Sequence, residues 1–291
     1  MSYDLYFRPA STGRAASPED FIRYFGQRRH FTTENGQSSY QNEDTGVYFS
    51  FELTPDDADP APVWADFSLN FARPRSFVVE AVPEIESFVS TFGLTVHDPQ
   101  MDGTVDGPFD ADRFINGWVS GNEAACMMMA ESGHPRPPAM PTGTLHAIWQ
   151  WNNGREGLQA QVGDSVFVPR IMFVAGPSAA RSAAVWTDAI PVLLPAVDVV
   201  LLYRDAYAPR RFLRRKPDVA VLEWGAMEPI LRTYREELGP VSYRRLEYEA
   251  PPPAISTLFT QAVASAPAGV LAADSVLETE LVERIPKWQQ P

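Results

Sequence analysis

Basic residues gather in one short segment of an otherwise acidic chain. Six of the 24 Lys and Arg residues fall within thirteen positions: Arg204, Arg210, Arg211, Arg214, Arg215 and Lys216. Guanidinium groups bind phosphates and carboxylates through paired N–H donors, so this segment could hold an anionic small molecule or a carboxylate-rich partner. A solvated loop between two strands, partly paired with the protein's own acids, explains the same residues, because Pro209 and Pro217 flank the run.

Acidic and aromatic side chains of the second half supply further candidates for binding. Asp188 and Asp198 flank a proline-interrupted apolar stretch at two expected strand ends, where sites often form in α/β sheets. Turn formation explains these carboxylates equally well. Four tryptophans could form a surface for a partner, although core packing is the default: Trp149, Trp151, Trp186 and Trp224. We take Asp188, Trp149 and Trp186 as candidate binding residues beside the arginines.

Common signatures of catalysis and of cofactor binding are absent from the sequence. It contains no glycine-rich dinucleotide or phosphate loop, no HExxH zinc pattern and no GxSxG nucleophile elbow. The four histidines are scattered singly along the chain: His30, His97, His134 and His146. We therefore expect no metal site and no cofactor, and the catalytic residues of an enzyme cannot be assigned.

Two positions are nevertheless chemically suggestive. His97 is followed by Asp98, but neighbouring residues of a strand point to opposite faces, so the two side chains should rarely touch. A turn before Pro99 explains Asp98 without any catalytic role. Cys126 could act as a nucleophile, but its Ala and Met neighbours favour a buried structural cysteine.

The first hundred residues have the pattern of one α+β unit. Apolar residues that alternate with polar ones predict strands in four places: Tyr3–Phe7, a hairpin over 31–53, Phe67–Phe71 and Leu94–His97. A helix should begin after Ser17, and helical spacing predicts another over 77–92 that Pro83 kinks or divides. The order β-α-β-β-β-α-β resembles a ferredoxin-like split βαβ unit with one added strand.

The second half has the pattern of a mixed sheet with flanking helices. Strands are expected at 166–174, 185–188, 197–203, 219–224 and 243–248, and helices at 227–238 and 255–266. A Met-rich helical stretch and a proline-rich run separate the halves. We expect an N-terminal α+β domain at 1–99, a helical and Pro-rich connector at 100–141, and a C-terminal mixed-sheet domain at 142–291.

The net charge and the cysteine content indicate the cellular compartment of the protein and the kind of partner that it binds. The chain has 24 Lys+Arg against 37 Asp+Glu, a net charge of −13. This charge repels phosphate backbones and anionic membranes, so we expect no nucleic-acid or membrane partner, and it attracts a basic protein surface. One cysteine excludes an intramolecular disulfide, and neither a signal-peptide pattern nor an 18-residue apolar run is found. We expect a cytoplasmic protein.

The expected function is non-enzymatic binding of a protein partner. An acidic, aromatic-rich chain without catalytic motifs is typical of immunity-type inhibitors that neutralise a basic partner. The alternative is a hydrolase or transferase that uses Asp and His residues in a cleft between the two halves. A third hypothesis is a module that recognises an anionic small molecule through the basic segment 204–216.

Overall fold

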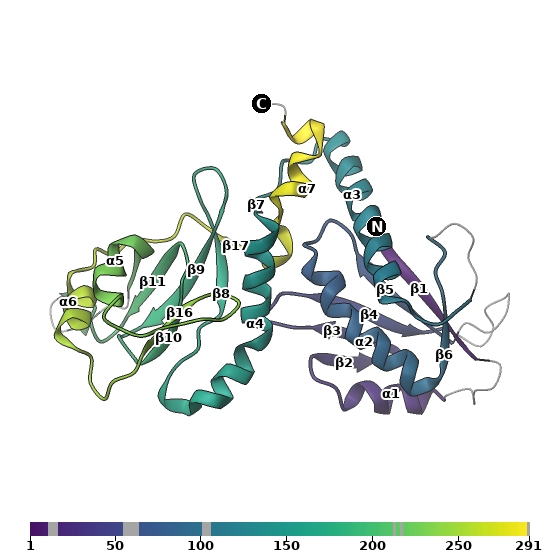
Figure 1. Ribbon diagram of the computed structural model, residues 1–291, viewed down its shortest axis with the longest axis horizontal. Helices are drawn as coiled ribbons and strands as arrows, with labels where there is room; N and C mark the ends of the chain where they lie inside the picture. The colour runs from purple at the N-terminus through teal and green to yellow at the C-terminus, as the bar shows by residue number, and fades with distance from the viewer. Residues whose placement is uncertain (11–16, 55–63, 101–105, 212–213, 216–217, 290–291) are drawn as a thin grey trace. The chain divides into compact units, whose positions relative to one another are not determined.

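The structure is a computed structural model that describes residues 1–10, 17–54, 64–100, 106–211, 214–215 and 218–289 (Figure 1). The chain forms two compact units. Unit 1 comprises Met1–Pro137 together with Leu277–Pro291, and unit 2 comprises Pro138–Val276. The α+β class expected from the sequence is confirmed, since each unit combines helices with sheets that are wholly or mainly antiparallel.

Unit 1 is built on a six-stranded sheet in the order β2-β3-β4-β5-β1-β6. Its strands are β1 (Ser2–Pro9), β2 (Phe31–Glu34), β3 (Gln37–Gln41), β4 (Tyr48–Leu53), β5 (Ala65–Asn70) and β6 (Leu94–His97). Every neighbouring pair is antiparallel. Alternation along β1 buries Tyr3, Leu5 and Phe7 in the core, whereas Asp4 and Tyr6 lie on the opposite face.

Three helices contribute apolar side chains to the core on that buried face: α1 (Pro18–Gly26), α2 (Ser76–Phe92) and α3 (Ala111–Glu131). Helix α1 begins with a capping box, in which the hydroxyl of Ser17 accepts from the backbone N–H of Asp20 at 3.2 Å. Helix α2 continues through Pro83, so this residue does not divide the helix, and the alternative expectation of a kink stays a prediction. Gly93 ends α2 in the left-handed conformation that glycine adopts most readily, with φ 62°.

Unit 1 has one strand more than the sequence pattern predicted. Residues 31–41 form a hairpin of their own, β2–β3, which turns at Asn35 and Gly36 with φ of 49° and 82°. Asn-Gly is a strong signal for a tight hairpin turn, and the prediction overlooked it. The likeness to a ferredoxin-like unit stays a prediction based on element order.

The expected domain boundaries differ from the observed units. Helix α3 was assigned to a connector, but its Phe114 and Trp118 are buried in the core of unit 1. The chain also returns to unit 1 at its end through β18 (Leu277–Glu278) and α7 (Thr279–Glu283). There the carboxylate of Glu278 accepts from the backbone N–H of Arg75 at 2.6 Å. This long-range return has no local sequence signal.

Unit 2 is built on a five-stranded mixed sheet in the order β14-β11-β9-β8-β17. Its strands are β8 (Ile171–Ala175), β9 (Ala180–Thr187), β11 (Val199–Arg204), β14 (Asp218–Glu223) and β17 (Val270–Leu271). Strands β9 and β11 are parallel, and the other pairs are antiparallel. A smaller antiparallel sheet contains β10 (Val192–Pro195), β16 (Tyr243–Leu246) and β15 (Glu236–Glu237).

The principal helices of unit 2 are α4 (Thr142–Val162), α5 (Trp224–Leu231) and α6 (Pro253–Gln261), and Ala139–Met140 form the short strand β7. Helix α4 is fastened to the start of β8 by Asn152, whose amide group exchanges two hydrogen bonds of 2.9 Å with the backbone of Ile171. Trp151 adds a hydrogen bond of 2.9 Å to the carbonyl of Pro169. Among the described residues, no helix is both long and apolar enough to cross a membrane.

Candidate functional site

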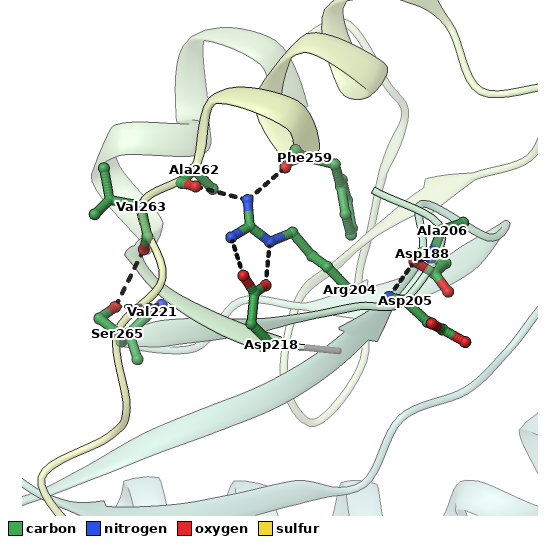
Figure 2. A network of polar contacts seen from close by, with 10 residues as sticks. All are labelled: Asp188, Arg204, Asp205, Ala206, Asp218, Val221, Phe259, Ala262, Val263 and Ser265. Carbon is green, nitrogen blue, oxygen red and sulfur yellow. Dashed lines mark hydrogen bonds and ion pairs between the residues drawn. The ribbon is translucent and has the colours of Figure 1, made fainter. Parts of the chain in front are cut away.

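Arg204, the first of the predicted binding residues, is buried at the end of β11. Its Nε and one terminal nitrogen donate to the two carboxylate oxygens of Asp218, at 2.7 and 3.0 Å. The other terminal nitrogen donates to the carbonyls of Phe259 and Ala262, at 2.8 and 2.6 Å, where α6 ends (Figure 2). The last carbonyls of a helix lack partners within it. Arg204 donates hydrogen bonds to two of these carbonyls. Its guanidinium is therefore engaged within unit 2, and we no longer count Arg204 as a binding residue.

The other arginines of the basic segment form a short hairpin. Strand β12 (Arg210–Arg211) pairs with β13 (Arg214–Arg215), and the register sets Arg210 opposite Arg215 and Arg211 opposite Arg214. Lys216 lies outside the described residues. Anion binding by this hairpin stays a prediction.

Trp186 lies near the end of β9, and Asp188 lies in the turn that follows this strand. Asp188 and Ala189 both have positive φ, 44° and 55°, a conformation that costs residues other than glycine about 1–2 kcal/mol each. The carboxylate of Asp188 accepts from the backbone N–H groups of Asp205 and Ala206, each at 2.9 Å (Figure 2). The indole of buried Trp186 donates to the carbonyl of Ile190 at 2.9 Å. Both predicted binding residues therefore stabilise a strained turn.

The remaining candidates of unit 2 are dispersed. Trp149 is half-buried on α4, with its ring 5.4 Å from that of His146. Asp198 accepts from the backbone N–H and the hydroxyl of Ser182, both at 2.7 Å, and so joins the starts of β9 and β11. These contacts give the carboxylate a structural role. The aromatic and acidic candidates do not converge on one site.

His97 ends β6 and Asp98 follows it, and the two side chains have separate partners in unit 1, as expected for neighbouring residues of extended chain. The Nδ1 atom of His97 lies 3.0 Å from Asp106, whose other oxygen accepts from Arg8 at 2.6 Å. Burial opposes ionisation of Asp106, but the hydrogen bonds and charges of Arg8 and His97 outweigh it and lower the pKa of this carboxyl. On the other side, Asp98 accepts a hydrogen bond from the hydroxyl of Tyr3. Burial, and secondarily Asp98, raises the pKa of Tyr3.

Cys126 is buried in α3, as expected for a structural cysteine. Burial raises the pKa of its thiol to about 11, and the charges of Glu278 and Glu123 add to the shift. A thiol with this pKa is a poor nucleophile at neutral pH. Within the described part of the chain, no three His, Cys, Asp or Glu side chains are grouped to hold a metal ion.

Carboxylates that the sequence reasoning did not single out lie on the open face of the six-stranded sheet. The register places Glu52 of β4 opposite Asp66 of β5, and Asp4 of β1 lies on the same face, opposite Ser68. Among the described residues, none of these three acids forms an ion pair. Burial, together with the charges of Glu52 and Asp4, raises the pKa of Asp66 to about 6. We call Asp4, Glu52 and Asp66 the acidic row.

The net charge is confined to unit 1. Its two segments contain 24 acidic and 11 basic residues, which gives −13, whereas unit 2 contains 13 of each and is neutral. The acidic character of the chain therefore belongs to the unit that carries the acidic row. The expected boundaries give nearly the same division, −12 for residues 1–141 and −1 for residues 142–291, because the final segment 277–291 has a net charge of only −1.

Comparisons with known proteins supply no family and no known function that could be applied to the fold or to these sites. No protein-family model matches the sequence, and neither a curated protein nor a solved structure matches it significantly.

Proposed function

We propose that this chain is a non-enzymatic protein-binding protein whose unit 1 takes a basic protein partner on the open face of its sheet, in the manner of an immunity-type inhibitor. The observation that carries the proposal is the concentration of the whole net charge of −13 in unit 1. Charge of one sign on one unit steers an oppositely charged partner toward it and speeds encounter.

The acidic row supplies the contact surface of this proposal. Glu52 and Asp66 face each other directly across two strands, an arrangement that destabilises a sheet by up to about 1 kcal/mol when both are ionised. A Lys or Arg side chain of a partner would relieve this repulsion.

The test compares two variants of equal net charge. The first neutralises the acidic row through Asp4→Asn, Glu52→Gln and Asp66→Asn. The second neutralises three exposed acids on α2 and α3, away from that face, through Glu86→Gln, Asp112→Asn and Glu131→Gln. The tagged full chain and both variants are used to capture partners from the source organism at low and high salt, and thermal unfolding checks that each variant is folded.

We expect the wild type and the helix-side variant to capture the same basic protein in stoichiometric amount. The acidic-row variant should lose it, and high salt should weaken capture because the contact is electrostatic. Capture that survives equally in both variants, or no stoichiometric basic partner at all, would contradict the proposal.

The enzyme alternative has less support. Among the described residues, His97 is the histidine whose ring is hydrogen-bonded to a carboxylate. No described hydroxyl or thiol is hydrogen-bonded to that ring, and the arrangement of nucleophile, base and orienting acid that nucleophilic catalysis requires is not assembled there.

A further inference from the structure

A pocket of about 390 Å³ lies in unit 1 where the first turn of α3 meets β1 and β6. Its apolar lining includes Leu5 of β1, Val96 of β6 and Phe114 of α3, all of which are buried. Ligand pockets usually measure about 300–1,000 Å³, so this pocket has room for a single side chain or a small molecule.

Two aromatic rings form part of the lining. The ring centroids of Phe109 and Phe114 are 5.6 Å apart, with an interplanar angle of 54°. Aromatic faces attract ammonium and guanidinium groups, and the attraction grows when the cation is removed from water. The aromatic pair favours a cationic ligand independently of any charged residue.

Charged residues around the pocket also favour a cationic ligand. Its lining contains the carboxylates of Asp98, Asp106 and Asp110 against the single guanidinium of Arg113. Arg8 already balances Asp106. Asp110 accepts from the backbone N–H of Arg113 at 3.0 Å as the N-cap of α3, and its second oxygen has no partner among the described residues. Negative charge therefore remains in excess beside the aromatic rings.

We propose that this pocket binds an alkylguanidinium or alkylammonium group, the chemistry of an arginine or lysine side chain. The aliphatic stem packs against the apolar lining, and the cationic head is held by the aromatic rings and the carboxylates of Asp98 and Asp110. The inference rests on the proposed function in one respect only, namely that the cationic group belongs to a basic side chain of the protein partner. A free small amine offers the same chemistry.

The test uses probes of defined charge and the full-length protein. Agmatine represents a free alkylguanidinium, the capped peptide acetyl-Gly-Gly-Arg-Gly-Gly-amide represents a partner's side chain, and N-butylacetamide is a neutral control. Backbone amide shifts of Gly107, Phe109 and Arg113 are followed by NMR during titration. We expect saturable shifts with both cations and binding at least about tenfold weaker for the neutral probe.

Three variants test whether the pocket prefers a positively charged ligand. Asp110→Asn removes a carboxylate but keeps an N-cap residue, and it should weaken agmatine binding about threefold or more. Arg113→Gln removes the opposing cation and should tighten binding. The control is Asp112→Asn, which removes the same charge two residues from Asp110 at a position that does not line the pocket. It should leave the affinity within about twofold.

Equal binding of the neutral probe, absence of saturable shifts with either cation, or weaker cation binding in Arg113→Gln would overturn the inference. Tighter binding of the peptide than of agmatine would identify a partner's side chain as the ligand, and equal binding would identify a free cation. Both outcomes support the pocket's chemistry. If agmatine binds but no basic protein is captured, the inference stands and the proposed function fails.

Discussion

Arg204 and Asp218 lie directly opposite each other on the antiparallel strands β11 and β14 and are joined by two parallel hydrogen bonds, at 2.7 and 3.0 Å. The same guanidinium holds the end of α6 through the carbonyls of Phe259 and Ala262 (Figure 2). One buried side chain of β11 thus reaches β14, 14 residues along the chain, and the end of α6, 55 and 58 residues along the chain.

Asp218→Ala should destabilise unit 2 by about 3 kcal/mol, because it leaves the Arg204 cation buried without its counter-ion. The matched control is Glu223→Ala on the same strand, which removes the partner of Arg181 at the surface and should cost less than about 1 kcal/mol. Chemical denaturation followed by tryptophan fluorescence measures both. Similar losses in the two variants would show that Arg204 does not depend on Asp218.

Asp66→Asn should stabilise unit 1 at neutral pH by up to about 1 kcal/mol, since it removes a half-buried carboxylate that faces Glu52. The pKa of Asp66 is raised from 3.8 to about 6, so the folded protein holds this proton more tightly than the unfolded chain does. Stability from this group is present below pH 4 and is lost as pH rises through 6.

The advantage of Asp66→Asn should therefore appear above about pH 6 and vanish below pH 4, where the wild-type carboxyl is protonated in both states. Thermal unfolding across this pH range measures it. Glu86→Gln, at an exposed position of α2, is the control and should give no pH-dependent gain. A constant difference between Asp66→Asn and wild type at every pH would contradict the assignment.

Local patterns predicted much of the fold and little of the site. Alternating apolar residues located β1, β4 and β5, and Ser17 marked the start of α1, because each signal lies within the element itself. The acidic row could not be found this way, since strand register alone brings Asp4, Glu52 and Asp66 together. Arg204 was misassigned for a similar reason: its neighbours in sequence suggested a basic loop, whereas its partners are distant.

The buried carboxylate of Glu80 on α2 supports a third prediction. One of its oxygens accepts from the hydroxyl of Tyr40 and the amide of Asn42, both at 2.7 Å. Tyr40→Phe keeps the ring, which stacks on Phe49 at 4.3 Å, but removes a hydrogen bond to a carboxylate. We expect a loss of about 1.5 kcal/mol in the free energy of unfolding. Tyr6→Phe, on the open face, should change it by less than about 0.5 kcal/mol, and equal effects would contradict the buried network.

Close approach of α3 to the sheet depends on glycine at position 117. A Cβ atom there would overlap the hydroxyl of Tyr3, whose bond to Asp98 fixes its position. Gly117→Ala should therefore destabilise unit 1 by about 1–3 kcal/mol through overpacking, even though alanine favours helix. Gly154→Ala in α4 meets no atom within 4 Å and should instead stabilise unit 2 by about 0.5–1 kcal/mol. The free energy of unfolding should therefore fall in Gly117→Ala and rise in Gly154→Ala, which separates the effect of packing from that of helix propensity. If both variants are more stable than the wild type, α3 does not need glycine at position 117.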